Sequence, residues 1–202
     1  MESRIYLASR SPRRRELLTQ IGVRFDLLLF RGNPREDPET DETVRPGEKS
    51  EDYVLRLARA KAHHGARLIA LRKLLSHPVL AADTALDVDG EIIGKPADAE
   101  DATRILRRLS GRSHRVLTGI AVAEGERTEH AISISEVRFR DLNDEEIRRY
   151  VLSGEPMDKA GAYGIQGRAA AFVAEIRGSH SGIVGLPLCE TTLLLRAFGY
   201  PL

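Results

Sequence analysis

The sequence predicts an α/β fold built around a mixed β-sheet, and three patterns support this prediction. The short apolar run VLAAD at 79–83 is typical of a buried strand. Two stretches at 114–124 and 129–140 alternate apolar and polar residues, as antiparallel strands do. Helical patterns, with apolar residues three and four positions apart, separate the strands. Buried and alternating strands in one chain indicate parallel and antiparallel pairing together.

Start and stop signals divide the first part of the chain. Ser11 and Pro12 are typical of a helix start, and Gly22 is typical of a helix end. Ser50, followed by two acidic residues, predicts the cap of a long helix in which Gly65 is a candidate break. The elements predicted in order are a strand at 4–8, a helix at 12–21, a strand at 23–30, a mobile loop at 31–49 and a helix from 50 towards 75.

Turn signals divide the second part in the same way. The pair Asp89-Gly90 between apolar arms predicts a tight hairpin directly after the buried strand. Gly111 ends the next helical pattern, and Gly125 lies between the two long alternating strands. The elements predicted after the hairpin are a helix at 98–109, strands at 114–124 and 129–140, a helix at 143–152, a hairpin at 170–185 and a helix at 187–198.

Composition predicts one globular domain spanning 1–202. A chain of 202 residues that is 42% apolar can bury a sizeable core. Lysine and arginine number 31 and acidic residues 30, so a net charge of +1 gives no reason to expect nucleic-acid binding. The single cysteine, Cys189, cannot form an internal disulfide and is predicted to lie in the core. With no charged leader and no long apolar stretch, we expect a cytoplasmic protein that does not enter a membrane.

The arginines at the first helix start suggest a phosphate site. Arg13 and Arg14 fall in the first turn, where positive charge opposes the helix dipole at a cost of some tenths of a kcal/mol each, up to about 1. Free backbone NH groups, the Ser11 hydroxyl and the guanidinium groups together suit a bound polyanion. A solvated basic face is the alternative. We favour the phosphate interpretation because a solvated face gains nothing at the unfavourable end of a helix.

Lys61 lies on the apolar stripe of the long helix rather than opposite it. The simplest interpretation is that its ammonium group extends past the apolar residues to the surface. If the side chain instead ends in a cleft, it supplies a compact positive charge for phosphate.

Asp83 follows directly on the buried run VLAA, at the predicted carboxyl end of that strand. In open α/β sheets, the residues that bind ligands and catalyse reactions gather at this edge. A carboxylate there is either partnered or functional, because an unpaired buried charge is costly. Turn or capping chemistry with Thr84 is an equally good interpretation of the stretch alone. Lys95, beyond the hairpin, either returns a cation to the same end or belongs to an ordinary turn.

The segment DKAGAYGIQG at 158–167 contains three glycines that allow close approach to a ligand. The amide of Gln166 has the donor and acceptor needed to read a base edge. The pattern is not a Walker A motif and lacks the context of a dinucleotide fingerprint.

Five segments occur in the order found in one family: SRSPRRRELL, LARAKA, AADT followed by GKP, DKAGAYGIQG and VGLPLCET. Over nearly its whole length the chain resembles the Maf family of nucleotide pyrophosphatases, in the branch that acts on dTTP and UTP. The resemblance implies an elongated, twisted mixed sheet flanked by helices, with two lobes around a cleft, as in Maf and Ham1 or ITPase-like proteins. It also implies hydrolysis of a nucleoside triphosphate to the monophosphate and pyrophosphate, dependence on Mg²⁺ or Mn²⁺, and a homodimer.

The resemblance also implies roles for individual residues. Asp83 corresponds to the proton acceptor and, with Glu42, to the acidic residues of the metal site, and Asp158 to another acidic residue of the same pocket. The positions that match specificity residues are Arg13, Thr84 and Gln166. The positions that match phosphate-binding residues are Ser11, Arg14, Lys61 and Lys95.

Two other functions are the alternatives for such a chain. One is a pyrophosphatase that prefers 7-methyl-GTP. The other is a nucleotide-binding regulator of cell division with little catalysis, against which the intact Asp83 argues.

Overall fold

The structure, a computed structural model, describes residues 3–30 and 41–202. Its centre is a long mixed sheet with the strand order β2-β1-β3-β5-β6-β7, and β4 pairs with β3 outside this path. β1 pairs in parallel with β2 and β3, whereas the other pairs are antiparallel. The strands are β1 (Ile5–Leu7), β2 (Phe25–Leu27), β3 (Val79–Val88), β4 (Glu91–Ile93), β5 (Ser113–Glu124), β6 (Arg127–Phe139) and β7 (Val173–Arg177). The predicted mixed α/β sheet is confirmed.

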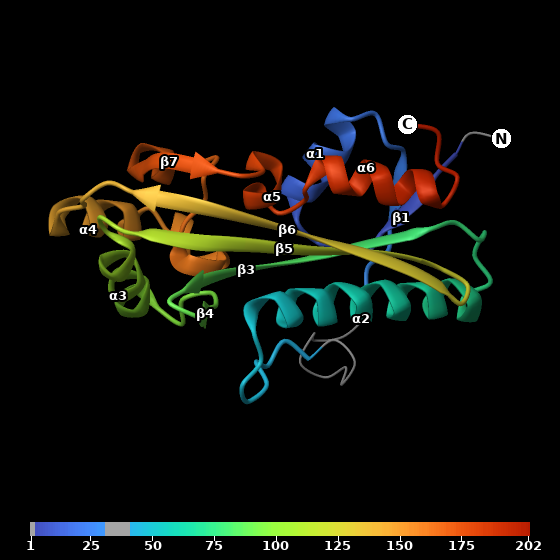
Figure 1. Cartoon of the computed structure of the whole chain (residues 1–202), viewed down its shortest axis with the longest axis horizontal. Helices are drawn as coiled ribbons and strands as arrows, with labels where there is room; N and C mark the ends of the chain where they lie inside the picture. Colours follow the sequence, from blue (N-terminus) through green and yellow to red (C-terminus); the bar gives the residue numbers. More distant parts are fainter. Residues whose placement is uncertain (1–2, 31–40) are drawn as a thin grey trace.

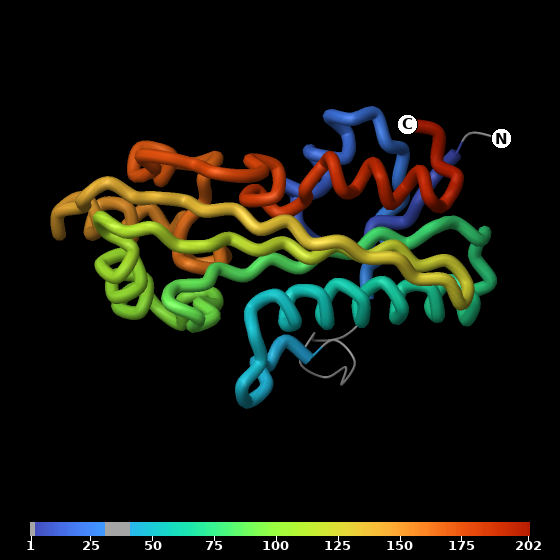
Figure 2. The backbone as a smooth tube through the Cα atoms, viewed as in Figure 1, coloured from blue at the N-terminus to red at the C-terminus, as the bar shows by residue number. Residues whose placement is uncertain are grey.

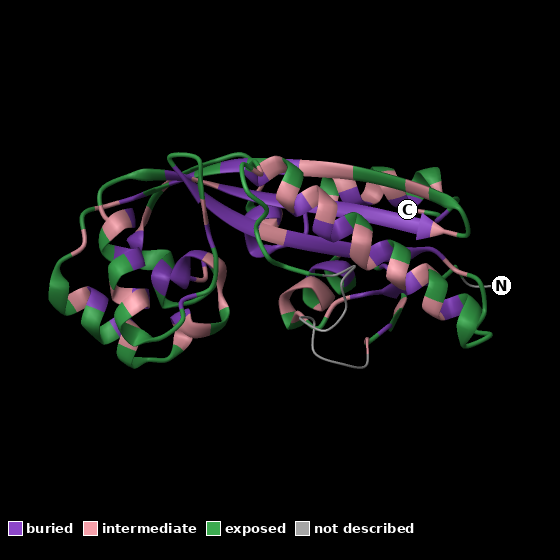
Figure 3. Ribbon diagram, turned by 90° about the horizontal axis from the view of Figure 1, so that it is seen from below, coloured by how far each residue is buried: buried purple, intermediate pink, exposed green. Residues whose placement is uncertain are grey.

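The helices gather in two groups along the length of this sheet (Figure 1). α1 and α6 cover one face at one end and α2 covers the other, while α3 and α4 lie at the opposite end (Figures 1 and 2). The buried strands run between the two groups (Figure 3). The helices are α1 (Pro12–Gln20), α2 (Ser50–Leu71), α3 (Ala99–Leu109), α4 (Asp144–Leu152), α5 (His180–Val184) and α6 (Leu188–Ala197). This arrangement agrees with the predicted elongated fold of two lobes.

α2 packs closely on the sheet because a glycine, Gly119, faces it from β5 and another, Gly65, lies on α2 itself. A Cβ atom on Gly119 of β5 would come within 2.6 Å of the carbonyl oxygen of Val54 on α2. A Cβ atom on Gly65 of α2 would come within 2.7 Å of a methyl group of Val79. The predicted break at Gly65 is therefore wrong, since the helix is continuous there and the glycine permits close packing. The close approach brings the polar residues of α2 within reach of β3.

One edge of β3 is left unpaired at its centre. β1 pairs with Val79 and Leu80 at the start of β3, and β4 pairs with Leu86 to Val88 at its end. Within the described residues, no strand pairs with this edge between those two ends, although β5 pairs along the other edge. The expectation that Asp83 ends its strand is therefore wrong. Asp83 and Thr84 instead lie mid-strand, at the point where the parallel neighbour β1 has ended.

Several other local predictions differ from the structure. Lys49, not Ser50, is the N-cap of α2, and the Ser50 hydroxyl donates to the buried carboxylate of Asp87. The predicted mobile loop at 31–49 lies partly outside the described residues, and 41–49 contains no helix or strand.

The predicted hairpin at 170–185 is also wrong, although its first half does contain β7. Ser179 begins a short helix instead, because its hydroxyl accepts a hydrogen bond from the backbone NH of Gly182 at 3.0 Å. The predicted core position of Cys189 is wrong as well, since the thiol is exposed. α6 buries Thr191 and Leu195, which lie on another side of the helix. Gly90 and Asp89 both have positive φ angles, so the predicted tight hairpin there is confirmed.

The buried imidazole of His114 should make the folded protein measurably less stable in mild acid. Its imidazole is buried in β5, and its Nε2 lies 2.7 Å from the Tyr163 hydroxyl. Burial lowers its pKa from 6.5 to about 4. The unfolded chain therefore binds more protons below about pH 6.5, so the stabilisation present at neutral pH is lost as the pH falls towards 4, on the order of 3 kcal/mol.

Urea unfolding of the wild type and of His114→Gln at pH 7.5 and pH 5 would measure this effect. We expect the wild type to lose more stability than the variant between the two pH values. An equal loss in both proteins would show that His114 does not contribute.

Candidate active site

The first turn of α1 directs Arg14 inward. Ser11 caps the helix, and its hydroxyl accepts a 3.4 Å hydrogen bond from the backbone NH of Arg14, as predicted. The Arg14 guanidinium donates from Nε to the carbonyl of Gly185 at 2.7 Å and from Nη2 to the Thr84 hydroxyl at 3.2 Å. A solvated basic face is therefore the wrong interpretation for Arg14, because its guanidinium is bonded to two segments that are distant in the sequence.

A chain of hydroxyl groups supports Arg14 from the sheet. Thr118, fully buried on β5, donates its only hydroxyl proton to the carbonyl of Gly182 at 2.8 Å. The Thr84 hydroxyl, 2.8 Å from that of Thr118, must therefore be the donor between the two. One lone pair of Thr84 accepts from Arg14, so its hydroxyl is largely committed within the protein. Gly185 has a φ of 125°, a backbone conformation that favours glycine, and presents its carbonyl to Arg14.

On the other face of β3, Lys61 joins two carboxylates. Its ammonium group donates to Oδ1 of Asp83 at 2.7 Å and to Oε1 of Glu42 at 2.8 Å. The Lys61 side chain is only 16% exposed, so the interpretation that it extends to the surface is wrong. Asp83 faces α2 while the neighbouring Thr84 faces α1, because successive residues of a strand point to opposite faces.

The charges in this cluster stabilise one another. Burial alone would lower the pKa of Lys61, but the carboxylates of Asp83 and Glu42 outweigh it and raise that pKa. Burial alone would raise the pKa of Glu42, but Lys61, followed by Lys95 and Arg14, lowers it. Burial lowers the pKa of Arg14, and the charge of Asp83 opposes that shift. Cations from α1, α2 and the segment after β4 therefore act on the same group of carboxylates.

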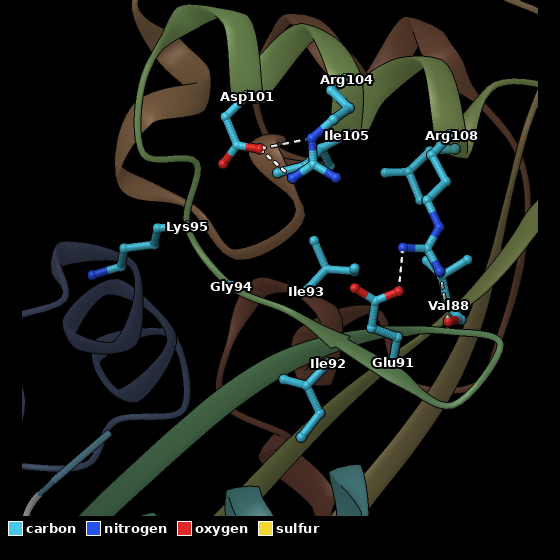
Figure 4. A pocket seen from close by; sticks show the side chains of 11 residues that line it. Val88, Glu91, Ile92, Ile93, Gly94, Lys95, Asp101, Arg104, Ile105 and Arg108 are labelled. Atoms are coloured by element: carbon cyan, nitrogen blue, oxygen red, sulfur yellow. Dashed lines mark hydrogen bonds and ion pairs between the residues drawn. The ribbon is translucent and has the colours of Figure 1, made fainter. Parts of the chain in front are cut away.

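Of the remaining predicted residues, Lys95 acts electrostatically on this linked group. Lys95 is exposed, and its charge contributes to the lowered pKa of Glu42. It lies at the rim of a pocket between β4 and α3, but its side chain points away from the pocket (Figure 4). That pocket is lined by apolar side chains and ion-paired arginines and does not include Asp83.

The glycine-rich segment at 158–167 carries two further predicted residues. Burial would raise the pKa of Asp158, but Lys159, followed by Arg13, lowers it, so Arg13 and Asp158 act on each other. Gln166 is exposed, and among the described contacts none joins it to Asp83 or Arg14. The backbone NH of Gly161 donates to the carbonyl of Gly94 at 3.0 Å and so holds this segment beside Lys95.

The sequence interpretation missed three residues that the structure adds to the site. Thr118 supports Thr84 from β5, while Tyr53 and Arg56 from α2 contact the backbone around Glu42. Thr118 lies in an alternating strand and the other two lie in an ordinary helical pattern. A polar residue at a buried position, as at Thr118, is the one signal that could have indicated such a role.

The carboxylates of Glu42 and Asp83 are candidate ligands for a divalent cation. Glu42 and Asp83 bring two carboxylates to one ammonium group, and no cluster of three or more His, Cys, Asp or Glu suited to a metal occurs in the described part of the chain. Mg²⁺ is commonly held by one or two carboxylates together with substrate phosphates and water. The donor set therefore fits a cation that arrives with a phosphorylated substrate.

Comparison with solved structures defines the class of fold. The chain is similar to the Ham1 protein of Staphylococcus aureus, with a TM-score of 0.51 at 15% sequence identity, covering 98% of this chain and 100% of that chain. The class is thus the elongated α/β fold of Ham1. Residues 4–198 match the family described as Maf-like protein, and the chain belongs to the Maf family.

Curated relatives extend over the whole chain. A protein of Aromatoleum aromaticum named dTTP/UTP pyrophosphatase is 64% identical, covering 100% of this chain and 98% of its own length. Proteins with the same name from Dechloromonas aromatica and Ralstonia nicotianae are 62% and 59% identical, covering 98% and 95% of this chain and 98% and 92% of their own lengths. Among the described residues, no helix is both long enough and apolar enough to cross a membrane.

Proposed function

We propose that this chain hydrolyses dTTP, UTP and modified pyrimidine nucleoside triphosphates to the monophosphate and pyrophosphate. The observation that carries the proposal is the link from Lys61 to Asp83 and Glu42 at the unpaired edge of β3, where the neighbouring Thr84 accepts a hydrogen bond from Arg14. A carboxylate that can serve as a base is thus close to cations from separate elements, and such cations stabilise the charge that develops on phosphate during hydrolysis. The names of the relatives support the choice of pyrimidine substrates.

In the proposed mechanism Asp83 is the general base. Lys61 holds Oδ1 of Asp83, and Oδ2 accepts a proton from the water that attacks the α-phosphorus. The bond between the α-phosphorus and the bridging oxygen breaks in line with the attack, and the electrons leave with pyrophosphate. We assign Ser11, Arg14, Lys61 and Lys95 to binding of the β- and γ-phosphates, where positive charge stabilises the leaving group.

A divalent cation, Mg²⁺ or Mn²⁺, would be held by Glu42 and Asp83. Such an ion, when bound, neutralises phosphate charge and polarises the phosphoryl group. Selection of the base is assigned to Arg13, Thr84 and Gln166. Because the Thr84 hydroxyl already bonds Arg14 and Thr118, only one acceptor position on it remains for a ligand. Asp158, beside Arg13, belongs to the same proposed pocket.

Release of pyrophosphate from a nucleotide panel tests the proposal. The panel contains dTTP, UTP, the other common triphosphates and 7-methyl-GTP, each with Mg²⁺, Mn²⁺ or excess chelator. We expect dTTP and UTP to have the highest kcat/KM and chelator to abolish release. Preference for 7-methyl-GTP would contradict the substrate assignment, and tight nucleotide binding without release would favour a regulator of cell division.

The proposal also covers the domain organisation, the oligomeric state and the cellular location of the protein. We propose that residues 1–202 act as one catalytic domain, that two copies form a homodimer, and that the protein is cytoplasmic. Light scattering of the purified protein measures the oligomeric state directly.

A further inference from the structure

The backbone that carries Glu42 is held by two side chains of α2. Arg56 donates from Nη1 to the carbonyl of Asp41 at 3.0 Å and from Nη2 to the carbonyl of Thr43 at 3.1 Å. The Tyr53 hydroxyl donates to the carbonyl between them, that of Glu42, at 3.0 Å. Three successive carbonyls are thus bound by side chains that lie one turn apart on the same helix. We call these two residues, Tyr53 and Arg56, the α2 clamp.

The α2 clamp replaces the support that a strand or helix would give. Residues 41–49 form a loop at the N-terminal end of α2 (Figures 1 and 2) and contain no regular element. Ordering backbone outside regular structure costs conformational entropy, which contacts must offset. The Glu42 side chain is 48% exposed, so burial holds it only in part.

Arg56 is itself rigidly placed. Its guanidinium forms a two-bonded ion pair with Glu48, from Nε to Oε1 at 2.6 Å and from Nη2 to Oε2 at 2.8 Å. The guanidinium carbon also lies 5.5 Å from the centre of the Tyr53 ring. Oε2 of Glu48 accepts a further hydrogen bond from the backbone NH of Arg45 at 3.0 Å, so the same carboxylate ties down the far side of the loop.

The result of these contacts is the direction of one side chain. With the backbone fixed at its carbonyls, the Glu42 carboxylate extends along α2 to the ammonium of Lys61 at 2.8 Å. Lys61 lies two helical turns beyond Tyr53 and bonds Asp83 as well. A loop freed from the α2 clamp would leave Lys61 and Asp83 in place, because both belong to regular elements, and would displace Glu42 alone.

We propose that Arg56, assisted by Tyr53, is a positioning residue that keeps the Glu42 carboxylate beside Lys61 and Asp83. Arg56 touches neither Lys61 nor Asp83 through a hydrogen bond and acts through the loop backbone. The catalytic consequence rests on the proposed function of Glu42, whereas the effect on the loop does not.

Two measurements on Arg56→Gln test the proposal, with Arg59→Gln as the matched control. Arg59 is an exposed arginine on the same helix, two residues before Lys61 and therefore on nearly the opposite side of the helix, and it lies outside the α2 clamp. Hydrogen exchange of the peptide covering 41–49 is read by mass spectrometry without nucleotide or metal. The amides of Thr43, Arg45 and Glu48 are hydrogen-bonded and report opening of the loop. We expect exchange there to be about tenfold faster in Arg56→Gln and unchanged in the control.

The second measurement is the dependence of dTTP hydrolysis on Mg²⁺ concentration. We expect Arg56→Gln to need several-fold more Mg²⁺ for half-maximal rate and to bind Mn²⁺, read by electron paramagnetic resonance, correspondingly more weakly. Arg56→Lys keeps the charge but loses the planar guanidinium that donates to several acceptors at once, so we expect it to resemble Arg56→Gln. Tyr53→Phe is a milder variant, because it keeps the aromatic ring and loses only the hydrogen bond to the Glu42 carbonyl. We expect it to show smaller changes of the same kind.

The outcomes separate this proposal from the proposed function. Exchange as slow in Arg56→Gln as in Arg59→Gln would overturn the α2 clamp, whatever the enzyme hydrolyses. Faster exchange with unchanged Mg²⁺ dependence and Mn²⁺ binding would overturn the positioning role. If the wild type hydrolyses no nucleotide, the proposed function fails, and exchange and Mn²⁺ binding still decide the inference.

Discussion

Replacing Asp83 with asparagine should lower kcat about 10³-fold while the protein remains folded, because the amide keeps the shape but cannot accept the proton of water. The change leaves Lys61 its second carboxylate, Glu42, at 2.8 Å, so the cluster keeps one ion pair. Steady-state release of pyrophosphate from dTTP, with the thermal midpoint measured in parallel, checks this expectation.

Asp87 offers a matched control in the same strand. Its carboxylate is also buried on β3 and also paired, with the Arg115 guanidinium at 2.9 Å, but it is not linked to Lys61. Asp87→Asn should lower stability and leave kcat within about twofold, since a weakened structural ion pair does not touch the reacting atoms. Near-normal turnover of folded Asp83→Asn, or equal losses in both variants, would contradict the role of Asp83.

Replacing Lys61 with methionine should lower the free energy of unfolding by about 3 kcal/mol at neutral pH, since the change leaves two nearby carboxylates without their shared cation. Methionine fills a similar volume, so the effect reports the lost charge more than a cavity. Activity should fall as well, because Lys61 is assigned to phosphate binding and orients Asp83.

The sign of the pH dependence distinguishes this explanation from a packing defect. In the wild type the pKa of Glu42 is lowered, so its contribution is present above the unfolded pKa of about 4.3 and is lost as the pH falls through the folded value. Without Lys61, burial should raise that pKa, and acid should then favour the folded variant. Urea unfolding of both proteins at pH 7.5 and pH 4 should show a smaller difference in acid. A difference independent of pH would indicate a packing defect.

At the unpaired edge of β3, the contacts of Asp83 with α2 and those of Thr84 with α1 come from adjacent residues. β1 ends beside Leu80, and the chain then turns into the loop and helix that carry Ser11 and Arg14. At the same level Asp83 faces α2 and Thr84 faces α1. The strand alternation thus serves both faces of the sheet from adjacent residues.

Local patterns predicted most of the elements, whereas the contacts between them depended on the fold. The Ser11 cap, the Asp89-Gly90 turn and the two long strands follow from short-range rules, and the structure confirms them. The family motifs named Lys61 and Asp83 separately. Their ion pair joins residues 22 positions apart in the sequence and depends on the close approach of α2 that Gly119 allows.

The failures have equally physical causes. The sequence around Ser179 predicts a hairpin, whereas the structure has a short helix. A single hydrogen bond from the Gly182 NH to the Ser179 hydroxyl caps that helix, and no longer pattern in the sequence marks it. Tyr53 and Arg56 looked like ordinary helix residues, since their partners are backbone carbonyls of a loop and no pattern of side chains marks such a contact. Side chains that bind backbone are thus the part of this site that sequence patterns describe least.

Hydrolysis of dTTP in ¹⁸O-labelled water tests the central claim most directly. If Asp83 activates water for attack at the α-phosphorus, the label must enter the nucleoside monophosphate, and pyrophosphate must leave unlabelled. Mass spectrometry of the separated products after a single turnover measures both. We expect one labelled oxygen in the monophosphate; label in pyrophosphate, or release of orthophosphate as the first product, would contradict the claim.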